Sequence, residues 1–268
     1  MRRPSSFLYT KPRDWGMLAL RIVRSWWYMI HLGAIAIVMA LSLKTYSRAN
    51  RLVASRFIYA STWEVLPWFT VLAALVSLVI IRIVVVTALS YGLSAYALEM
   101  VVRVLVLELI PLTAAMFVAL RASMAFNAGD ALAVAAAASP DRSQRAQARL
   151  RQELVPQVIA NAFAVLSLAL VSSVIVLVLA YANVYGLSPW GLQDYTRTVG
   201  RIFNPAVTIG FMAKTIAFGL AVAVIPTAAI LEMHRYGLRS SSTVQPGAVR
   251  LLFVLLLIEA ASLAMKYI

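Results

Sequence analysis

Cysteine is absent from the 268-residue sequence, and histidine occurs only twice, at His31 and His234. The lack of cysteine excludes disulfide bonds and thiolate metal sites. The two histidines lie far apart along the chain and do not form a metal-ligand pattern. The sequence therefore gives no support for a resident metal.

Acidic residues are also few, since Asp and Glu together number ten and are mostly scattered at the ends of apolar stretches. No carboxylate pair and no Ser/His/Asp arrangement indicates catalysis. The sequence G-x-x-x-x-G-K-[ST], which cradles nucleotide phosphates, does not occur. We expect neither enzyme activity nor a cofactor on this chain; if ATP drives it, ATP and Mg²⁺ bind to another polypeptide.

What the sequence has in abundance is apolar residues, which make up 62% of it and give a mean hydropathy of +0.86. Soluble domains average about 45–50% apolar residues. The composition predicts an all-α, polytopic membrane protein with five or six spanning helices. This length leaves no room for a separate soluble catalytic domain.

The net charge of +14 comes from basic residues that gather beside the apolar stretches. Ten Lys or Arg precede residue 60, four lie at 142–151 and three lie at 235–250, so these clusters hold most of the 24. This is the positive-inside pattern, with anionic lipid headgroups as the counter-charge. It argues against nucleic acid as a partner and predicts a cytosolic N-terminus.

Residues 1–60 form the first predicted unit. Its apolar run, 29–43, is close to the shortest length that spans a bilayer. Basic residues on both sides of this run suit a helix that lies in the interface, because both of its ends then stay on one side. The alternatives are a short transmembrane helix and an interfacial elbow helix, and we favour the elbow.

Residues 61–268 form the second predicted unit, a transmembrane domain of five spans. We expect the spans at about 64–89, 96–126, 155–181, 205–231 and 248–267. Pro67 would interrupt the first span. The turn at 90–94 and a loop at 183–202 would face outward, and the alanine-rich, then basic, segment 128–152 would be cytosolic.

The second span carries ionisable residues within a run that is otherwise apolar enough for lipid. Such groups cost at least about 2.5–3.5 kcal/mol at bilayer depth, so Glu108 is expected to face the protein interior or a wet cavity. Pro111, three residues later, removes a helical hydrogen bond and bends the helix. Arg103 is expected to pair with Glu99, one turn before it.

Two short motifs carry a family resemblance. Residues 108–111, E-L-I-P, followed by A-L-R-A-S at 119–123, resemble the E-L-G-P…A-G-R-x-G signature of the MlaE/YrbE permeases. Residues 214–219, K-T-I-A-F-G, resemble the K-x3-F-G motif of the same family. Those proteins are the membrane subunits of ABC transporters that move phospholipids or other lipids with MCE-domain partners.

The resemblance implies a substrate site. In the related permeases the matching Glu lies beside a lipid-binding cavity at the dimer centre, which assigns that role to Glu108. Leu107 stands where the family often has Arg. Arg82 lies deep in the first span, where its side chain could reach a lipid phosphate, Glu108 or Glu259. The predicted substrate-binding residues are Glu108, Tyr91, Ala88, Ile80, Leu107 and Arg82.

Other residues are assigned structural or coupling roles. Arg121 either snorkels to the interface or contacts another helix or subunit. Lys214 is either a headgroup contact or an anchor at the outer leaflet, and Glu259 is expected to pair with a basic group. The predicted set is Pro111, Arg121, Lys214, Glu259, Arg142 and Arg145.

The segment 128–152 should dock an ATPase, as it does in MlaE-like proteins, but the family's docking residues are replaced. Gly129 stands in place of a Glu, and residues 136–138, A-A-A, stand where T-E-Q is expected. Either the subunit docks its ATPase differently, or it is the divergent half of a heterodimer, which we favour.

These observations predict the permease subunit of an ATP-driven lipid transporter in the bacterial inner membrane. It would pair with an identical or related permease, above a cytosolic ATPase dimer and below a periplasmic MCE-domain ring. One alternative is a scaffold that has lost transport. The other is an ion-coupled secondary transporter that uses Glu108 and Arg82 as a relay.

Overall fold

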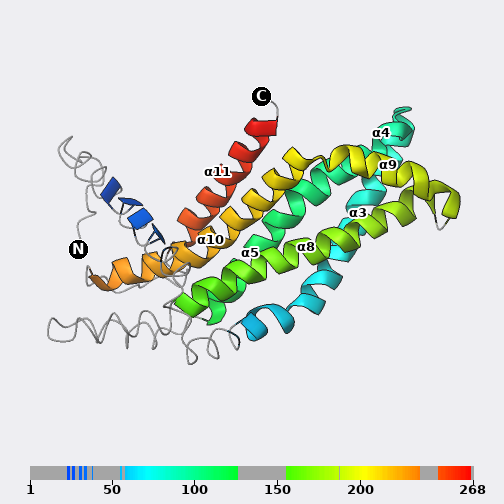
Figure 1. Ribbon diagram of the computed structural model, residues 1–268. Coiled ribbons are helices and arrows are strands. Elements are labelled where there is room, and N and C mark those ends of the chain that lie inside the picture. Colours follow the sequence, from blue (N-terminus) through cyan, green and yellow to red (C-terminus); the bar gives the residue numbers. More distant parts are fainter. Residues whose placement is uncertain are drawn as a thin grey trace, which may run out of the picture.

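The computed structural model describes residues 58–125, 155–186, 188–235 and 247–266, together with ten scattered positions between 23 and 55. The described part is helical, with no strand (Figure 1). The predicted first unit therefore lies largely outside the described residues, and the predicted coupling segment 128–152 lies outside them entirely.

Five helical stretches in the described part are long and apolar enough to cross a membrane, which confirms the all-α polytopic fold. The helices, in chain order, are η2 Tyr59–Trp63, α3 Leu66–Ser90, α4 Ser94–Met100, η3 Val101–Leu109, α5 Ile110–Ala125, α8 Val155–Tyr185, η6 Pro189–Gly191, α9 Leu192–Ile202, α10 Pro205–Arg235 and α11 Ala248–Lys266. The second span is composed of α4, η3 and α5.

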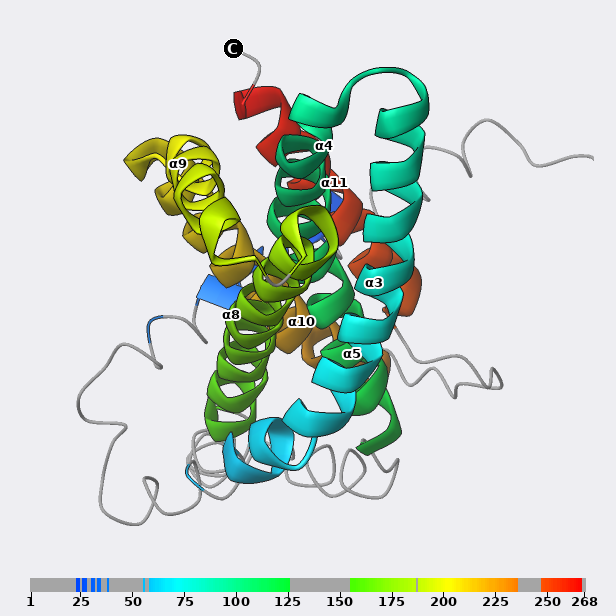
Figure 2. The same cartoon turned by 90° about the vertical axis from the view of Figure 1, so that its right-hand side faces the viewer.

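The bundle is built around α8 and α10, which pack against each other along their lengths (Figure 2). Helix α3 packs on α8, α11 packs on α10, and α5 contacts both central helices. Small residues permit this packing. In lipid the hydrophobic effect does not drive helices together, so they associate through close van der Waals contact, which small side chains allow. Gly219 of α10 is the clearest case, since a Cβ there would lie 2.9 Å from the carbonyl oxygen of Ala162 in α8.

Local chemistry fixes several helix ends. The side chain of Asn204 accepts a hydrogen bond from the backbone N–H of Val207 at 2.8 Å, and Pro205 follows it at the first position of α10. At the end of α3, Gly92 adopts a positive φ of 73°, and Leu93 N–H donates to the Ala88 carbonyl at 2.7 Å. Glycine adopts this left-handed conformation without steric cost, so the chain reverses there within a short turn.

Two local expectations differ from the structure. Pro67 lies in the first turn of α3 and begins the helix instead of interrupting it, because a first-turn N–H needs no helical partner. The segment 183–202, expected as a loop, contains the helix α9. One face of α9 packs into the core through Tyr195, Val199 and Ile202, whereas its other face is exposed and polar, and this pattern stabilises a helix.

Candidate functional site

Lys214 lies inside the bundle. It stands on α10 and is only 4% exposed. Its ammonium nitrogen forms ion pairs with Glu108 of η3 and, at 2.9 Å, with Glu259 of α11. The Glu108 contact is a hydrogen bond, whereas the Glu259 contact lacks hydrogen-bond geometry. We call Lys214, Glu108 and Glu259 the Lys214 cluster.

The cluster joins three spans that are distant in sequence. The side chains of Glu108 and Glu259 are 14% and 13% exposed, so all three charged groups are largely removed from solvent. Buried ion pairs of this kind give little net stability, but loss of one partner leaves an uncompensated buried charge. The cluster therefore fixes how α10, η3 and α11 sit against one another.

The helix that carries Glu108 is irregular at this point. Residues Val101–Leu109 form a π-helix, whose wider turns are frequent at functional sites. Pro111 follows and has no backbone N–H to donate to the preceding turn. The Lys214 ammonium donates to the carbonyl oxygen of Leu107, within that turn, at 3.1 Å. Lys214 thus bonds a backbone acceptor next to the proline as well as pairing with two carboxylates.

The neighbours of Lys214 in its motif have defined places. Phe218 is fully buried, and the Lys214 ammonium lies 5.8 Å from the centre of its ring, within the range of a cation–π interaction. Gly219 permits the close approach to α8. The three motif positions of K-x3-F-G therefore serve charge pairing, ring packing and helix contact.

The cluster lies toward the end of the bundle where α10 begins and α11 ends. Lys214 is nine residues from the start of α10, about 14 Å along the axis, and Glu259 is seven residues from the end of α11, about 10 Å. Against a hydrocarbon core of about 30 Å, these positions are inside the membrane and in one half of it.

The other predicted substrate residues do not line one opening in the single chain. Ala88 and Leu107 are buried in one apolar core, and Ile80 packs against it. Tyr91 lies in the turn after α3 and is 76% exposed. Within one subunit, the structure places only Glu108 in the cluster, beside the backbone of Leu107.

Arg82 is exposed on α3 and has no ion pair within the described residues. Glu108 and Glu259, two of the partners considered for it, pair with Lys214 instead. The sequence offered a signal for Lys214, because its motif and its apolar span are both visible there. It offered no means of matching the lysine to two acids on other helices.

Two further ion pairs lie at opposite ends of the bundle. Arg103 Nε donates to Glu99 Oε1 at 2.8 Å, which confirms the predicted helical pair. Arg121 Nη2 donates to Glu64 Oε2 at 3.3 Å, so this arginine contacts the segment before α3. Arg142 and Arg145 lie outside the described residues.

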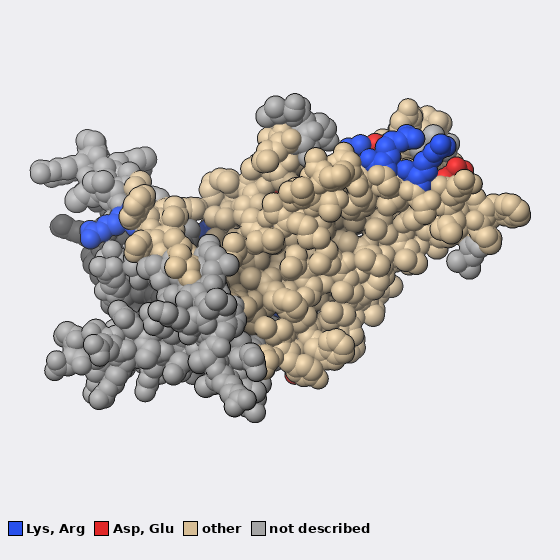
Figure 3. Space-filling view, viewed as in Figure 1, with Lys and Arg blue, Asp and Glu red and all other residues tan. Residues whose placement is uncertain are grey.

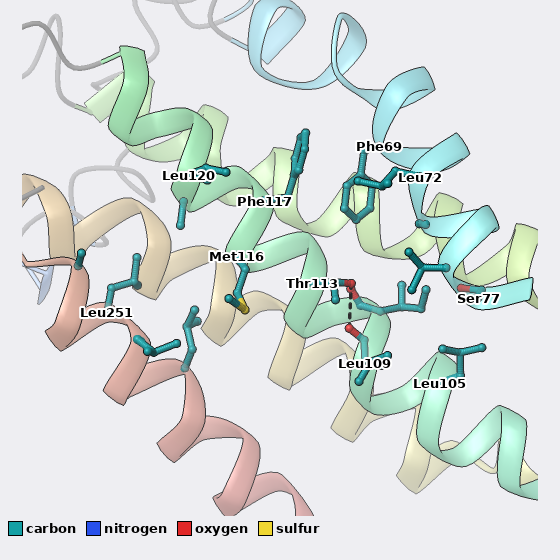
Figure 4. Close-up of a pocket in the computed structure, with 17 residues that line it drawn as sticks. Phe69, Leu72, Ser77, Leu105, Leu109, Thr113, Met116, Phe117, Leu120 and Leu251 are labelled. Atoms are coloured by element: carbon teal, nitrogen blue, oxygen red, sulfur yellow. Dashed lines mark hydrogen bonds between the residues drawn. The ribbon is translucent and has the colours of Figure 1, made fainter. Parts of the chain in front are cut away.

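A cavity of about 610 Å³ lies between α3, η3/α5 and α11, and we call it the α3–α11 groove (Figure 4). Its lining is apolar except for Ser77 and Thr113. Leu105, Leu109 and Ile110 line it, but Glu108 between them does not. The groove and the Lys214 cluster are therefore adjacent and separate. The lining residues are Phe69, Leu72, Ala73, Val76, Ser77, Leu105, Leu109, Ile110, Thr113, Met116, Phe117, Ala119, Leu120, Ala248, Leu251, Leu252 and Leu255.

The surface agrees with a membrane location. On the face in Figure 3, charged side chains gather at the end where α9 lies, whereas the described surface over the long helices is almost free of charge. The exposed charged residues of α9 are Asp194, Arg197 and Arg201. Among the described residues there is no group of three or more His, Cys, Asp or Glu side chains able to hold a metal ion.

Five apolar spans with a buried charge cluster between three of them define a class of protein, a polytopic α-helical membrane protein. Residues 54–265 match the family profile "Permease MlaE". The chain therefore belongs to the MlaE permease family and is a membrane permease of the lipid ABC-transporter class. No curated protein and no solved structure matches it significantly.

Proposed function

We propose that this chain is the permease subunit of an ATP-driven transporter that moves phospholipid or another lipid between the bacterial inner and outer membranes. It acts as a dimer with an identical or related permease, with ATPase subunits at the cytosolic face and an MCE-domain ring at the other. Its N-terminus is cytosolic. The observation that carries the proposal is the buried contact between Glu108 and Lys214, one residue from each of the two family motifs.

The cluster supports a mechanical role in transport. Lys214 contacts η3 and α11 at once, so α10 cannot shift along these helices without moving or breaking ion pairs in low dielectric. We propose that movement begun by ATPase subunits at the cytosolic helix ends reaches the outer half of the membrane through this link. There it changes the space available to a lipid.

Reconstitution tests the proposal. An affinity-tagged full-length chain, purified in mild detergent from its own host, should retain an ATPase and an MCE-domain protein. The purified complex in liposomes should transfer a fluorescent phospholipid only with hydrolysable ATP. Absence of both partner proteins under conditions that keep the permease folded would overturn the assignment.

The cluster also gives specific support to a second candidate, an ion-coupled transporter. Carboxylates at bilayer depth are common members of proton relays, and the cluster contains two of them. The two functions differ in their energy source, so transport by the permease alone under a proton gradient, without ATPase, would favour this candidate. A scaffold that transports nothing would be favoured if Glu108→Gln left transfer by the complex unchanged.

A further inference from the structure

The α3–α11 groove extends from the depth of the Lys214 cluster into the other half of the bundle. Its floor is formed by η3 and α5, and its walls are the first half of α3 and the first half of α11. On α11 the lining ends at Leu255, one turn before Glu259. The groove thus runs from the cluster toward the end where α5 ends and α11 begins, next to the basic segments that we place in the cytosol.

The groove offers nothing to a polar ligand. Of its two polar side chains, Ser77 is 1% exposed, and the Thr113 hydroxyl already donates within its own helix, toward the carbonyls of Leu109 at 2.9 Å and Ile110 at 3.0 Å. Its volume of about 610 Å³ falls within the range of about 300–1,000 Å³ typical of small-molecule sites. Such a lining favours a hydrocarbon chain over a sugar, nucleotide or amino acid.

A cation, Arg121, is next in sequence to the groove lining near the end of α5, although it is not itself part of the lining. Arg121 follows Leu120 of the lining and stands one helical turn after Phe117, whose ring packs on Phe69 across the groove wall. Its guanidinium makes one hydrogen bond, at 3.3 Å, to a Glu64 carboxylate that is 60% exposed. Its Nη1 is enclosed without a hydrogen-bond partner in the described structure. Arginine presents several N–H donors in a planar fork that matches phosphate oxygens. The guanidinium of Arg121 therefore has N–H donors that the described residues do not use.

We propose that the α3–α11 groove binds a phospholipid of the cytosolic leaflet, with one acyl chain along η3 and α5 and its phosphate at Arg121. The proposal rests on the lipid-handling function above and adds a site separate from the Lys214 cluster. An apolar slot with an arginine next to its lining complements a molecule with a tail and an anionic headgroup. If a helix of another subunit filled the groove instead, that helix would need an acidic residue at the depth of Arg121 to neutralise the guanidinium.

The test uses the full-length chain in detergent without nucleotide, and native mass spectrometry counts the lipids it retains. The probes are palmitoyl-oleoyl phosphatidylglycerol and the diacylglycerol with the same two chains. We expect the wild-type chain to retain one phospholipid and little diacylglycerol. Met116 lines the groove and is 46% exposed. Met116→Trp should therefore fill the groove and abolish lipid retention. Arg121→Gln should lower it about tenfold, which is the effect of about 1.4 kcal/mol.

Val174→Trp is the matched control. Val174 is 61% exposed on α8 and lies outside the groove, so the same substitution adds the same bulk without blocking the site. Thermal midpoints in the same detergent show whether each variant is folded. Arg121→Lys should recover part of the retention, because it restores the charge but not the fork.

Any of the following results would overturn the proposal. One is equal retention by Met116→Trp and Val174→Trp. Another is retention of diacylglycerol as strong as that of the phospholipid, or retention unaffected by Arg121→Gln. The last is cross-linking of Leu252→Cys to a second chain with no lipid retained, which would assign the groove to a protein helix. Because retention is measured without ATP, ATP-dependent transfer by the whole complex can succeed or fail independently of it.

Discussion

The ammonium of Lys214 lies 3.1 Å from the carbonyl oxygen of Leu107, and these two residues come from different spans. This carbonyl lies one turn before Pro111, which has no backbone N–H, in a stretch with π-helical hydrogen bonding. One lysine therefore donates to the backbone of the irregular turn and also pairs with Glu108 and Glu259. In lipid, water cannot satisfy backbone carbonyls at such a turn, so donors from neighbouring helices matter more than in a soluble protein.

Removal of the lysine should be the most damaging change in the cluster. Lys214→Met leaves two carboxylates without their cation, and loss of one partner from a buried pair costs about 3–5 kcal/mol. We expect a corresponding fall in unfolding free energy, measured by denaturation in mixed micelles. The triple variant Lys214→Met/Glu108→Gln/Glu259→Gln removes all three charges and should regain most of this stability.

The same variants separate stability from function. If the charges serve transport, the triple variant should fold and remain inactive in ATP-dependent lipid transfer. A triple variant with both normal stability and normal transfer would show that the cluster is only structural.

A second prediction concerns the contact between α10 and α8. Gly219→Ala places a Cβ 2.9 Å from a backbone oxygen that cannot move without moving α8, so we expect a loss of about 1–3 kcal/mol, the range for overpacking. Gly210→Ala, in the same helix, meets nothing within 4 Å and should be neutral or slightly stabilising. Thermal midpoints of the two variants check this, and equal midpoints would contradict the close contact.

A third prediction concerns Arg82. It stands nine residues after Ala73 of the groove, half a turn away at about 100° per residue, and is exposed at bilayer depth. A charge there is costly unless another molecule covers it, so we expect this face of α3 to meet the second permease of the dimer. Because the chain has no cysteine, single-cysteine variants are clean probes: Val86→Cys should cross-link, and Val174→Cys on α8 should not.

The identity of the cross-linked partner also distinguishes the two kinds of dimer. A product between identical chains indicates a homodimer. A product only with a different chain of the complex indicates a heterodimer. If Val86→Cys cross-links to neither, the α3 face is not the subunit interface.

A fourth prediction concerns pH and Tyr195 of α9, outside the spans. Burial raises the pKa of Tyr195 above its ordinary value of 10.0, and its hydroxyl donates to the Leu177 carbonyl at 2.9 Å. The unfolded chain then loses this proton at lower pH than the folded one, so stability should fall as pH rises through about 10. Tyr195→Phe should cost about 1 kcal/mol at neutral pH and reduce this alkaline loss. An unchanged alkaline profile would contradict the prediction.

Features that depend on local sequence could be predicted. The five spans match the structure closely, and the Arg103–Glu99 pair follows from helical spacing alone. The family resemblance was visible in two short motifs and is confirmed by the match over residues 54–265. Helix α9 was missed because its apolar residues are few and the Gly and Pro beside it suggested a loop.

The pairing of charges could not be predicted in the same way. Glu108 was recognised as costly in lipid and Glu259 was expected to pair with a basic group, but Lys214 was interpreted as a headgroup contact or an anchor at the outer leaflet. Glu108 and Lys214 are 106 positions apart, and no periodicity relates them. The groove could not be predicted for the same reason. Its lining comes from four helical elements, and in the sequence these residues cannot be distinguished from other apolar residues of the spans.

The sequence alone determined that this chain lies in a membrane, where the five spans of the described part lie and which family it resembles, because hydropathy and short motifs are properties of neighbouring residues. The tertiary structure decided which buried charges neutralise one another and where an acyl chain has room. Those outcomes depend on how α3, α5, α10 and α11 cross in space, and the free energy of a buried charge is set by the partners that this crossing brings within about 3 Å.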